Sequence, residues 1–252
     1  MKRLFLLLAA AFLLPVLSAA QTADEIVAKA LAARGGIPKI KAVQSQRISG
    51  SISFGPEVSG PFQVELSRPG KLHMEITLPQ GKVVRVYDGK GNGWVILPFG
   101  ENRGAQPMSD EDIKNINEES DFDGPFVDAK EKGNTVELTG KEDIDGKPAY
   151  RLKLTMKNGN VRDYWVDASS YLLLKWQGTR KQDDKDITVE STFKDYRDVN
   201  GLKFAFTIET GLPGGPAMQR IVLEKIEIDP KIAATRFAKP AEPSGAAKSP
   251  SN

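Results

Sequence analysis

Apolar and polar residues alternate along most of the chain from residue 48 onward, with the period of two that is typical of a half-buried β-strand. The run from 71 to 78 shows the pattern most clearly. Its apolar positions are Leu72, Met74, Ile76 and Leu78, and its polar positions are His73, Glu75 and Thr77. About eleven such short runs follow one another, ended by turn residues and not by crossover helices, which predicts antiparallel pairing.

Two segments have helical spacing instead. Thr22 to Arg34 begins with a capping box of Thr22 and Glu25 and ends at two glycines. Asp110 to Glu119 follows Ser109, which forms a second predicted capping box with Asp112, and carries a thin apolar stripe. Two helices are too few to form a second layer over so large a sheet, but they could cover the concave side of a strongly curved one.

The expected fold is therefore mostly β (α+β), a strongly curved antiparallel sheet with one apolar side. Whether the space enclosed by the apolar side is a packed core or a ligand cavity stays open at this point.

The first twenty residues have the pattern of a cleaved secretory signal peptide. Lys2 and Arg3 precede an apolar run, and Ser18-Ala19-Ala20 provides small residues before a cleavage site at Gln21. We expect export to the periplasm, a folded domain over residues 21–238 and a disordered tail over residues 239–252, which are rich in Pro, Ala and Ser. The chain has no cysteine, so neither disulfides nor a lipidated cysteine are expected.

Charge excludes one class of partner. Without Lys2 and Arg3, 33 of the 35 basic residues remain against 33 acidic ones, and no block of like charge occurs. A basic patch for nucleic acid is therefore not expected.

We find no catalytic, cofactor or metal motif in the sequence. The one histidine, His73, falls on the polar side of its strand and is predicted to be a surface residue without the further ligands of a zinc site. The acidic run of Glu118, Glu119, Asp121 and Asp123 could suggest a carboxylate pair, but a solvated face at a helix end is the favoured interpretation. We therefore expect no enzyme activity and no cofactor.

The segment from Ser67 to Gly100 carries a resemblance. It reads SRPGKLHMEITLPQGKVVRVYDGKGNGWVILPFG, an Arg-Pro pair, a strand, an Asp-Gly-Lys turn, a Trp and a Pro-Phe in order. This order resembles the LolA/LolB-like periplasmic lipoprotein carriers. The resemblance implies an unclosed β-barrel, lidded by short helices, whose apolar inside receives acyl chains.

In that family the arginine of the Arg-Pro pair contacts the lid and helps to set its open and closed states; the matching residue here is Arg68. The family's cavity aromatic four residues later is replaced by Leu72. The candidate cavity and gate residues are Arg68, Leu72, Met74, Ile76, Trp94, Phe99, Trp165, Trp176, Phe204 and Phe206.

The resemblance and the apolar side together predict a monomeric periplasmic carrier of lipid-modified proteins or lipids, with membrane-bound donor or acceptor proteins as partners. The alternative is a LolA-like envelope sensor or interaction domain without a transport role. Each candidate residue could also be ordinary core.

Overall fold

The computed structural model describes residues 21–100, 102–182 and 185–241, whose strands form one antiparallel sheet. Thirteen strands take part, where the sequence predicted about eleven. They are β1 (Ser45–Phe54), β2 (Val58–Ser67), β3 (Lys71–Leu78), β4 (Gly81–Tyr87), β5 (Gly93–Ile96), β6 (Gln106–Pro107), β7 (Thr135–Ile144), β8 (Lys147–Thr155), β9 (Val161–Asp167), β10 (Leu173–Gln182), β11 (Lys185–Val199), β12 (Leu202–Gly211) and β13 (Ala217–Ile228). The two-residue β6 is too short to produce an alternating pattern, so sequence periodicity could not reveal it.

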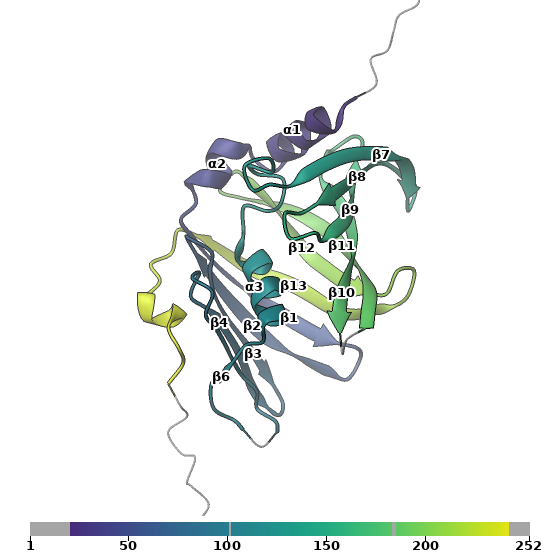
Figure 1. Ribbon diagram of the computed structural model, residues 1–252. Coiled ribbons are helices and arrows are strands. Elements are labelled where there is room, and N and C mark those ends of the chain that lie inside the picture. Colours follow the sequence, from purple (N-terminus) through teal and green to yellow (C-terminus); the bar gives the residue numbers. More distant parts are fainter. Residues whose placement is uncertain (1–20, 101, 183–184, 242–252) are drawn as a thin grey trace, which may run out of the picture.

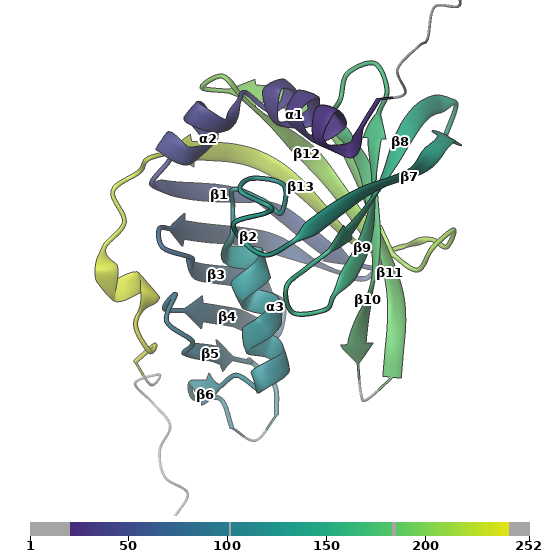
Figure 2. The ribbon, with the colours of Figure 1, turned by 45° about the horizontal axis from the view of Figure 1, so that its top comes forward.

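The sheet has two wings that meet at one strand pair. The N-terminal wing is β1 to β6 and the C-terminal wing is β7 to β13, each built from strands that pair with their neighbours in sequence. β1 pairs with β13 and joins the wings. At Gly50 on this seam a Cβ atom would lie 2.0 Å from the Val222 carbonyl oxygen, so only glycine fits there. The sheet curves strongly and its outermost strands, β6 and β7, do not pair, so the barrel is unclosed (Figures 1 and 2).

Each strand separates an inner, concave face from an outer face, as the alternation predicted. Across β1 to β3, the inner positions Ile48, Val64 and Met74 are register partners, and so are the outer positions Arg47, Glu65 and His73. The inner apolar side chains gather in contiguous clusters, one of them built around Ile52, Phe62, Ile76, Phe206, Leu223 and Ile226. Burial of this apolar surface is the main driving force that keeps the wings curved around one interior.

Three α-helices cover the concave side: α1 (Ala23–Ala33), α2 (Ile37–Ala42) and α3 (Asp110–Ser120). The predicted capping box of α1 is present, since Thr22 Oγ1 accepts from Glu25 N and Glu25 Oε2 accepts from Thr22 N. The helix α2 was not predicted, because six residues with a proline in the first turn are too few to show a helical period. None of the helices in the described ranges combines the length and the apolar character needed to cross a bilayer.

The connection between the wings crosses the open side of the barrel. α3 packs against β3 and β4 of the N-terminal wing through Ile116, which is fully buried beside Leu72 and Tyr87. Residues 121–134 then lead across to β7 and insert Phe126 and Val127 beneath α1 and α2. Figure 2 shows α3 standing in front of the concave face between the two wings.

After β13 the chain runs along the outer face of the sheet, opposite to the face that the helices cover. Residues 229–238, called the C-terminal strap below, run outside the N-terminal wing and contain the short 3₁₀-helix η1 (Ala234–Phe237) (Figure 2). The expected signal peptide lies outside the described residues, and so do residues 242–252 of the expected tail.

Candidate functional site

Most of the candidate cavity residues do meet on the inner face. Leu72 is buried under α3, in a cluster with Ile116. Met74 packs against both this cluster and the central cluster around Ile76 and Phe206. Ile76 and Phe206 are buried in the central cluster, and Phe204 packs against it from β12. Trp176 packs against a third cluster, below α1. Together these six residues line a continuous apolar interior beneath the helices.

Three candidates lie elsewhere, and here the expectation was wrong. The register pairs Trp94 with Val86 and Val86 with His73, which puts Trp94 on the outer face. Phe99 follows β5 in a loop and is 53% exposed. Strand alternation sends successive side chains to opposite faces, and the face that Trp94 occupies is set by its pairing with β4.

Trp165 is also on the outer face, although it is buried. Its register partner is Arg151, and its ring lies between the cations of Arg151 and Lys175, 5.2 and 4.4 Å from the ring centroid. Its indole Nε1 donates to Glu142 Oε2 over 3.0 Å. This tryptophan is covered by long charged side chains and not by the apolar interior.

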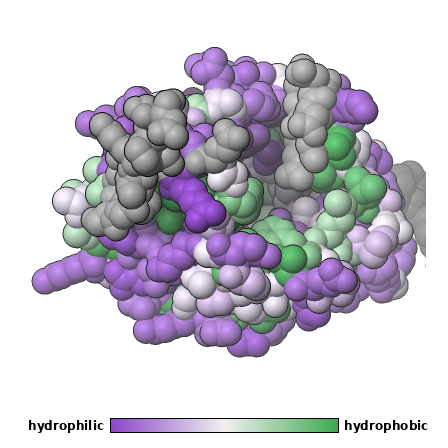
Figure 3. Space-filling model, turned by 90° about the horizontal axis from the view of Figure 1, so that it is seen from below, coloured by the Kyte–Doolittle hydropathy of each residue, from purple (hydrophilic) through white to green (hydrophobic). Residues whose placement is uncertain are grey.

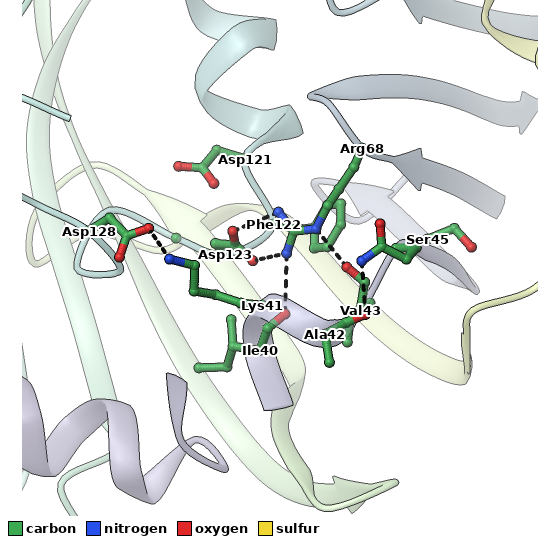
Figure 4. Close-up of polar contacts among 12 residues, drawn as sticks. Ile40, Lys41, Ala42, Val43, Ser45, Arg68, Asp121, Phe122, Asp123 and Asp128 are labelled. Carbon is green, nitrogen blue, oxygen red and sulfur yellow. Dashed lines mark hydrogen bonds and ion pairs between the residues drawn. The ribbon is translucent and has the colours of Figure 1, made fainter. Parts of the chain in front are cut away.

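Arg68 stands at the end of β2, where it joins three separate segments (Figure 4). Its Nη1 and Nη2 donate to the two carboxylate oxygens of Asp123 over 2.8 and 2.6 Å. Nε donates to the Val43 carbonyl oxygen over 2.7 Å, and Nη2 also donates to that of Ile40 over 3.3 Å. These two carbonyls belong to the C-terminal end of α2, where main-chain acceptors lack helical partners.

The segment that Arg68 holds is fixed by a second arginine. Arg34, at the C-terminal end of α1, donates from Nη1 to the Asp123 carbonyl oxygen over 2.7 Å. The guanidinium of Arg68 also lies 4.8 Å from the centre of the Phe122 ring. Hydrogen bonding to Asp123 raises the pKa of Arg68, whereas burial lowers the pKa of Arg34. Residues 122 and 123 are thus clamped between α1, α2 and β2.

Only Glu119 of the acidic run at the end of α3 is exposed, so the interpretation as a solvated face is wrong for Glu118, Asp121 and Asp123. Glu118 accepts from Arg162 of β9 and from the side-chain amides of Asn158 and Asn160. Glu119 accepts from Arg85 of β4. The next two carboxylates, Asp121 and Asp123, pair with Lys132 and Arg68. Since β4 and β9 belong to different wings, neighbouring glutamates tie α3 to both sides of the opening.

A cleft of about 790 Å³ lies beside this end of α3. Its walls include Arg68, Glu118, Asp121, Lys132 and Arg162, and its apolar wall residues include Phe122 and Met156. Phe122 and Met156 also pack against the interior clusters. The cleft therefore has a charged rim and an apolar part that is continuous with the interior.

Viewed from below, hydrophobic residues surround a recess near the centre of the molecule, and hydrophilic residues make up much of the outer rim (Figure 3).

His73 is buried, at 6% exposure, so the prediction of a surface histidine was wrong. The C-terminal strap covers this part of the outer face, and Arg236 of η1 reaches His73 Nδ1 over 2.9 Å. No group of three metal-binding side chains occurs within the described residues.

The arrangement of the sheet matches several solved structures. A LolA superfamily protein from Nitrosomonas europaea superposes with a TM-score of 0.55 at 16% identity, covering 87% of this chain and 99% of that one. A domain from Vibrio parahaemolyticus named for outer-membrane lipoprotein sorting gives 0.54 at 12% identity, covering 86% and 96%. A DUF1329 family protein from Desulfovibrio piger gives 0.53 at 14% identity, covering 86% and 97%.

The chain has the LolA-like fold. This confirms the unclosed, lidded barrel expected from the resemblance of residues 67–100. No protein-family model matches the sequence, and no curated protein matches it either. At identities of 16% and below, the agreement concerns the fold, and the function must be argued from the residues of this chain.

Two parts of this candidate site were not foreseen. Asp123 is the carboxylate partner of Arg68, 55 residues away, and Glu118 joins α3 to the C-terminal wing. The sequence signal for both residues was the acidic run that contains them, considered together with Arg68, whose guanidinium requires an acceptor. Their pairing depends on how α3 crosses the barrel, which strand periodicity does not report.

Proposed function

We propose that this protein is a carrier that binds the acyl chains of lipids or lipid-modified proteins against its inner face, without catalytic chemistry. The observation that carries the proposal is a LolA-like sheet whose apolar concave face is covered by a helix held at its edges by charged residues. Each methylene transferred from water into such an interior contributes about 0.8 kcal/mol. A site of this kind can therefore take up an acyl chain once the helix moves.

Location and partners belong to the same proposal. The signal-peptide pattern of residues 1–20 supports a location in the periplasm. The folded domain would comprise residues 21–238. Membrane-bound donor and acceptor proteins would be its partners, and the monomer would be the working unit.

We assign the cover of the site to α3 and the control of that cover to Arg68. α3 contributes few apolar side chains to the interior, chiefly Ile113 and Ile116, so moving it exposes little apolar surface of its own. Arg68 links residue 123, just after α3, to the end of α2. Breaking this contact would release both helices together.

A disulfide can test whether α3 must move. A Cβ atom built at Gly70 would lie 3.4 Å from Ser120 Oγ at the end of α3, so side chains at the two positions are neighbours, although the φ of +58° at Gly70 makes any side chain there strained. The natural chain has no cysteine, so the pair Gly70→Cys and Ser120→Cys has no competing partner. We expect the oxidised double variant to lose saturable binding of a diacylated lipopeptide, measured by displacement of a hydrophobic dye.

The same protein after reduction is the matched control and should regain binding. If the oxidised form binds as well as the reduced form, α3 is not the cover of the site. If wild-type protein shows no saturable binding and carries no lipid in native mass spectrometry, the carrier proposal fails and an interaction domain becomes the better interpretation.

Arg68→Leu tests the control step. It keeps apolar bulk and removes all four donated bonds. We expect the variant to bind lipopeptide at least as well as wild type but to pass it to acceptor vesicles more slowly, because the open and closed states are no longer balanced. Transfer at the wild-type rate would show that Arg68 is only structural.

A further inference from the structure

The C-terminal strap is fixed to the outer face of the N-terminal wing by polar contacts around one arginine. Arg236 Nε donates to Glu65 Oε2 over 2.7 Å, and its Nη2 donates to Glu75 Oε1 over 2.9 Å. Beside it, Phe237 is 5% exposed and lies under the ammonium of Lys71. Upstream, the Ser45 hydroxyl donates to the Pro230 carbonyl oxygen over 2.8 Å. The strap thus has a main-chain anchor at its start and a charged clamp at its end.

The only histidine of the chain lies at the centre of that clamp. Its Nδ1 is 2.9 Å from Arg236 Nη2. A guanidinium can only donate, so Nδ1 must be an unprotonated acceptor and the ring proton must be on Nε2. The contact therefore requires a neutral imidazole.

We propose that His73 and Arg236 form a proton-sensitive latch, which holds the C-terminal strap against the sheet when His73 is neutral and releases it when His73 is protonated. A proton on Nδ1 would place an N–H group against the guanidinium N–H and would set two positive charges in contact. The carboxylates of Glu65 and Glu75, 3.9 and 3.6 Å from the ring nitrogens, would then become acceptors for the imidazolium. The acceptors that now hold Arg236 would be shared with His73.

The charged groups around the ring support this direction. From β2 comes Glu65, from β3 Glu75 and from η1 Arg236, while Arg47 and Lys82 bind the far sides of the two glutamates. Burial, and then the charge of Arg236, lower the pKa of His73, and the two glutamates only partly oppose them. Burial opposes ionisation of Glu65 and Glu75, but the hydrogen bonds they accept outweigh it and lower the pKa of each. Both carboxylates therefore stay charged while His73 titrates.

The sign of the pH dependence follows from linkage. With the strap released, His73 returns toward its ordinary pKa of about 6.5, so the released state binds more protons than the latched state. The latch is at full strength above that value and weakens as the pH falls through the lowered pKa of the latched state. This inference concerns the outer face and does not depend on lipid binding.

Hydrogen exchange of the strap provides the test. We would compare residues 229–238 at about pH 7.5 and about pH 5.5, corrected for intrinsic exchange rates, in the full-length mature protein. Wild-type protection should fall at the lower pH, because the released state binds more protons there than the latched state does. His73→Gln, which cannot titrate, should give the same protection at both pH values, and a segment of the C-terminal wing such as residues 150–154 should not respond in either protein.

The single histidine also gives a direct reading of its own protonation by NMR. The pKa of His73 should lie below the ordinary value in wild type and rise toward it in Arg236→Gln, in which the strap is released at every pH. Protection of the strap that is independent of pH in wild type would overturn the latch. A pKa of His73 that is the same in wild type and in Arg236→Gln would also overturn the latch. This measurement does not require His73→Gln to fold.

Discussion

Two arginines clamp chain segments onto opposite faces of the same wing, and they differ in what they hold on to. Arg68 holds the connection between the wings to the inner side, through a carboxylate and two main-chain carbonyls. Arg236 holds the C-terminal strap to the outer side, through two carboxylates and an imidazole nitrogen. Both segments lie far from their partners in sequence.

The difference lies in how each clamp can be opened. The acceptors of Arg68 include no histidine, so this clamp would open through competition for the helices it joins. One acceptor of Arg236 is a histidine, so that clamp can respond to the pH itself. In the proposed carrier, the inner clamp would be controlled by the bound ligand, whereas the outer clamp would respond to the pH of the surroundings.

The largest effect on stability should come from removing the inner clamp. Arg68→Leu leaves Asp123, 8% exposed, without its cationic partner. We expect a loss of about 2–3 kcal/mol in the free energy of unfolding, the size of hydrogen bonds to charged groups. Such a loss still leaves a typical domain folded, because total stabilities are about 5–15 kcal/mol.

Urea denaturation measures this loss, and Arg236→Leu is the comparison. The outer variant should lower the free energy of unfolding less, because its effect is confined to a terminal segment that can detach while the sheet stays intact. Equal losses in the two variants would contradict the distinction between the clamps.

Neighbouring glutamates on α3 provide the next test. Glu118 is 18% exposed and accepts from three side chains, whereas Glu119 is 45% exposed and accepts from one. Glu118→Gln should lower the free energy of unfolding by about 1–2 kcal/mol, while Glu119→Gln should cost about 0–1 kcal/mol, as exposed ion pairs do. Urea denaturation of both variants checks this, and a reversed order would mean that α3 is held chiefly from the N-terminal wing.

The sequence was sufficient for the features that depend on local pattern. Alternation in residues 71–78 assigned the inner and outer faces of β3 correctly, and Thr22 with Glu25 marked the start of α1. Both follow from interactions within a few residues, which the order of the chain records directly.

The features that could not be predicted depend on segments that are distant in the sequence and cover one face of the sheet. His73 has the position of a solvent-facing residue in its strand, and it is buried only because residues from 230 onward return over it. Trp94 and Trp165 are large and apolar, so they suggest a core, yet their register puts both on the outer face, where Trp165 is covered by charged side chains. Periodicity reports which side of a sheet a residue occupies, but it does not report what lies against that side.

The outer clamp should produce a small pH dependence of global stability. Because the pKa of His73 is lowered in the folded protein, the unfolded chain binds its proton first as the pH falls below the ordinary value of about 6.5. The free energy of unfolding should therefore decrease as the pH falls from 7 to 5. Urea denaturation at both pH values should show this decrease in wild type but not in His73→Gln; an equal decrease in both would assign it to other groups.

The smallest effect should come from an ion pair that looks like the inner clamp in Figure 4 but lies in solvent. Lys41 Nζ is 2.7 Å from Asp128 Oδ2, as close as the contacts of Arg68, yet the two side chains are 50% and 37% exposed. In water the attraction is offset by hydration and by the entropy of holding a long side chain still. Lys41→Ala should therefore leave the urea midpoint unchanged within error. A shift approaching that of Arg68→Leu would show that proximity alone stabilises this region, and that the burial of Asp123 is not what sets the strength of the inner clamp.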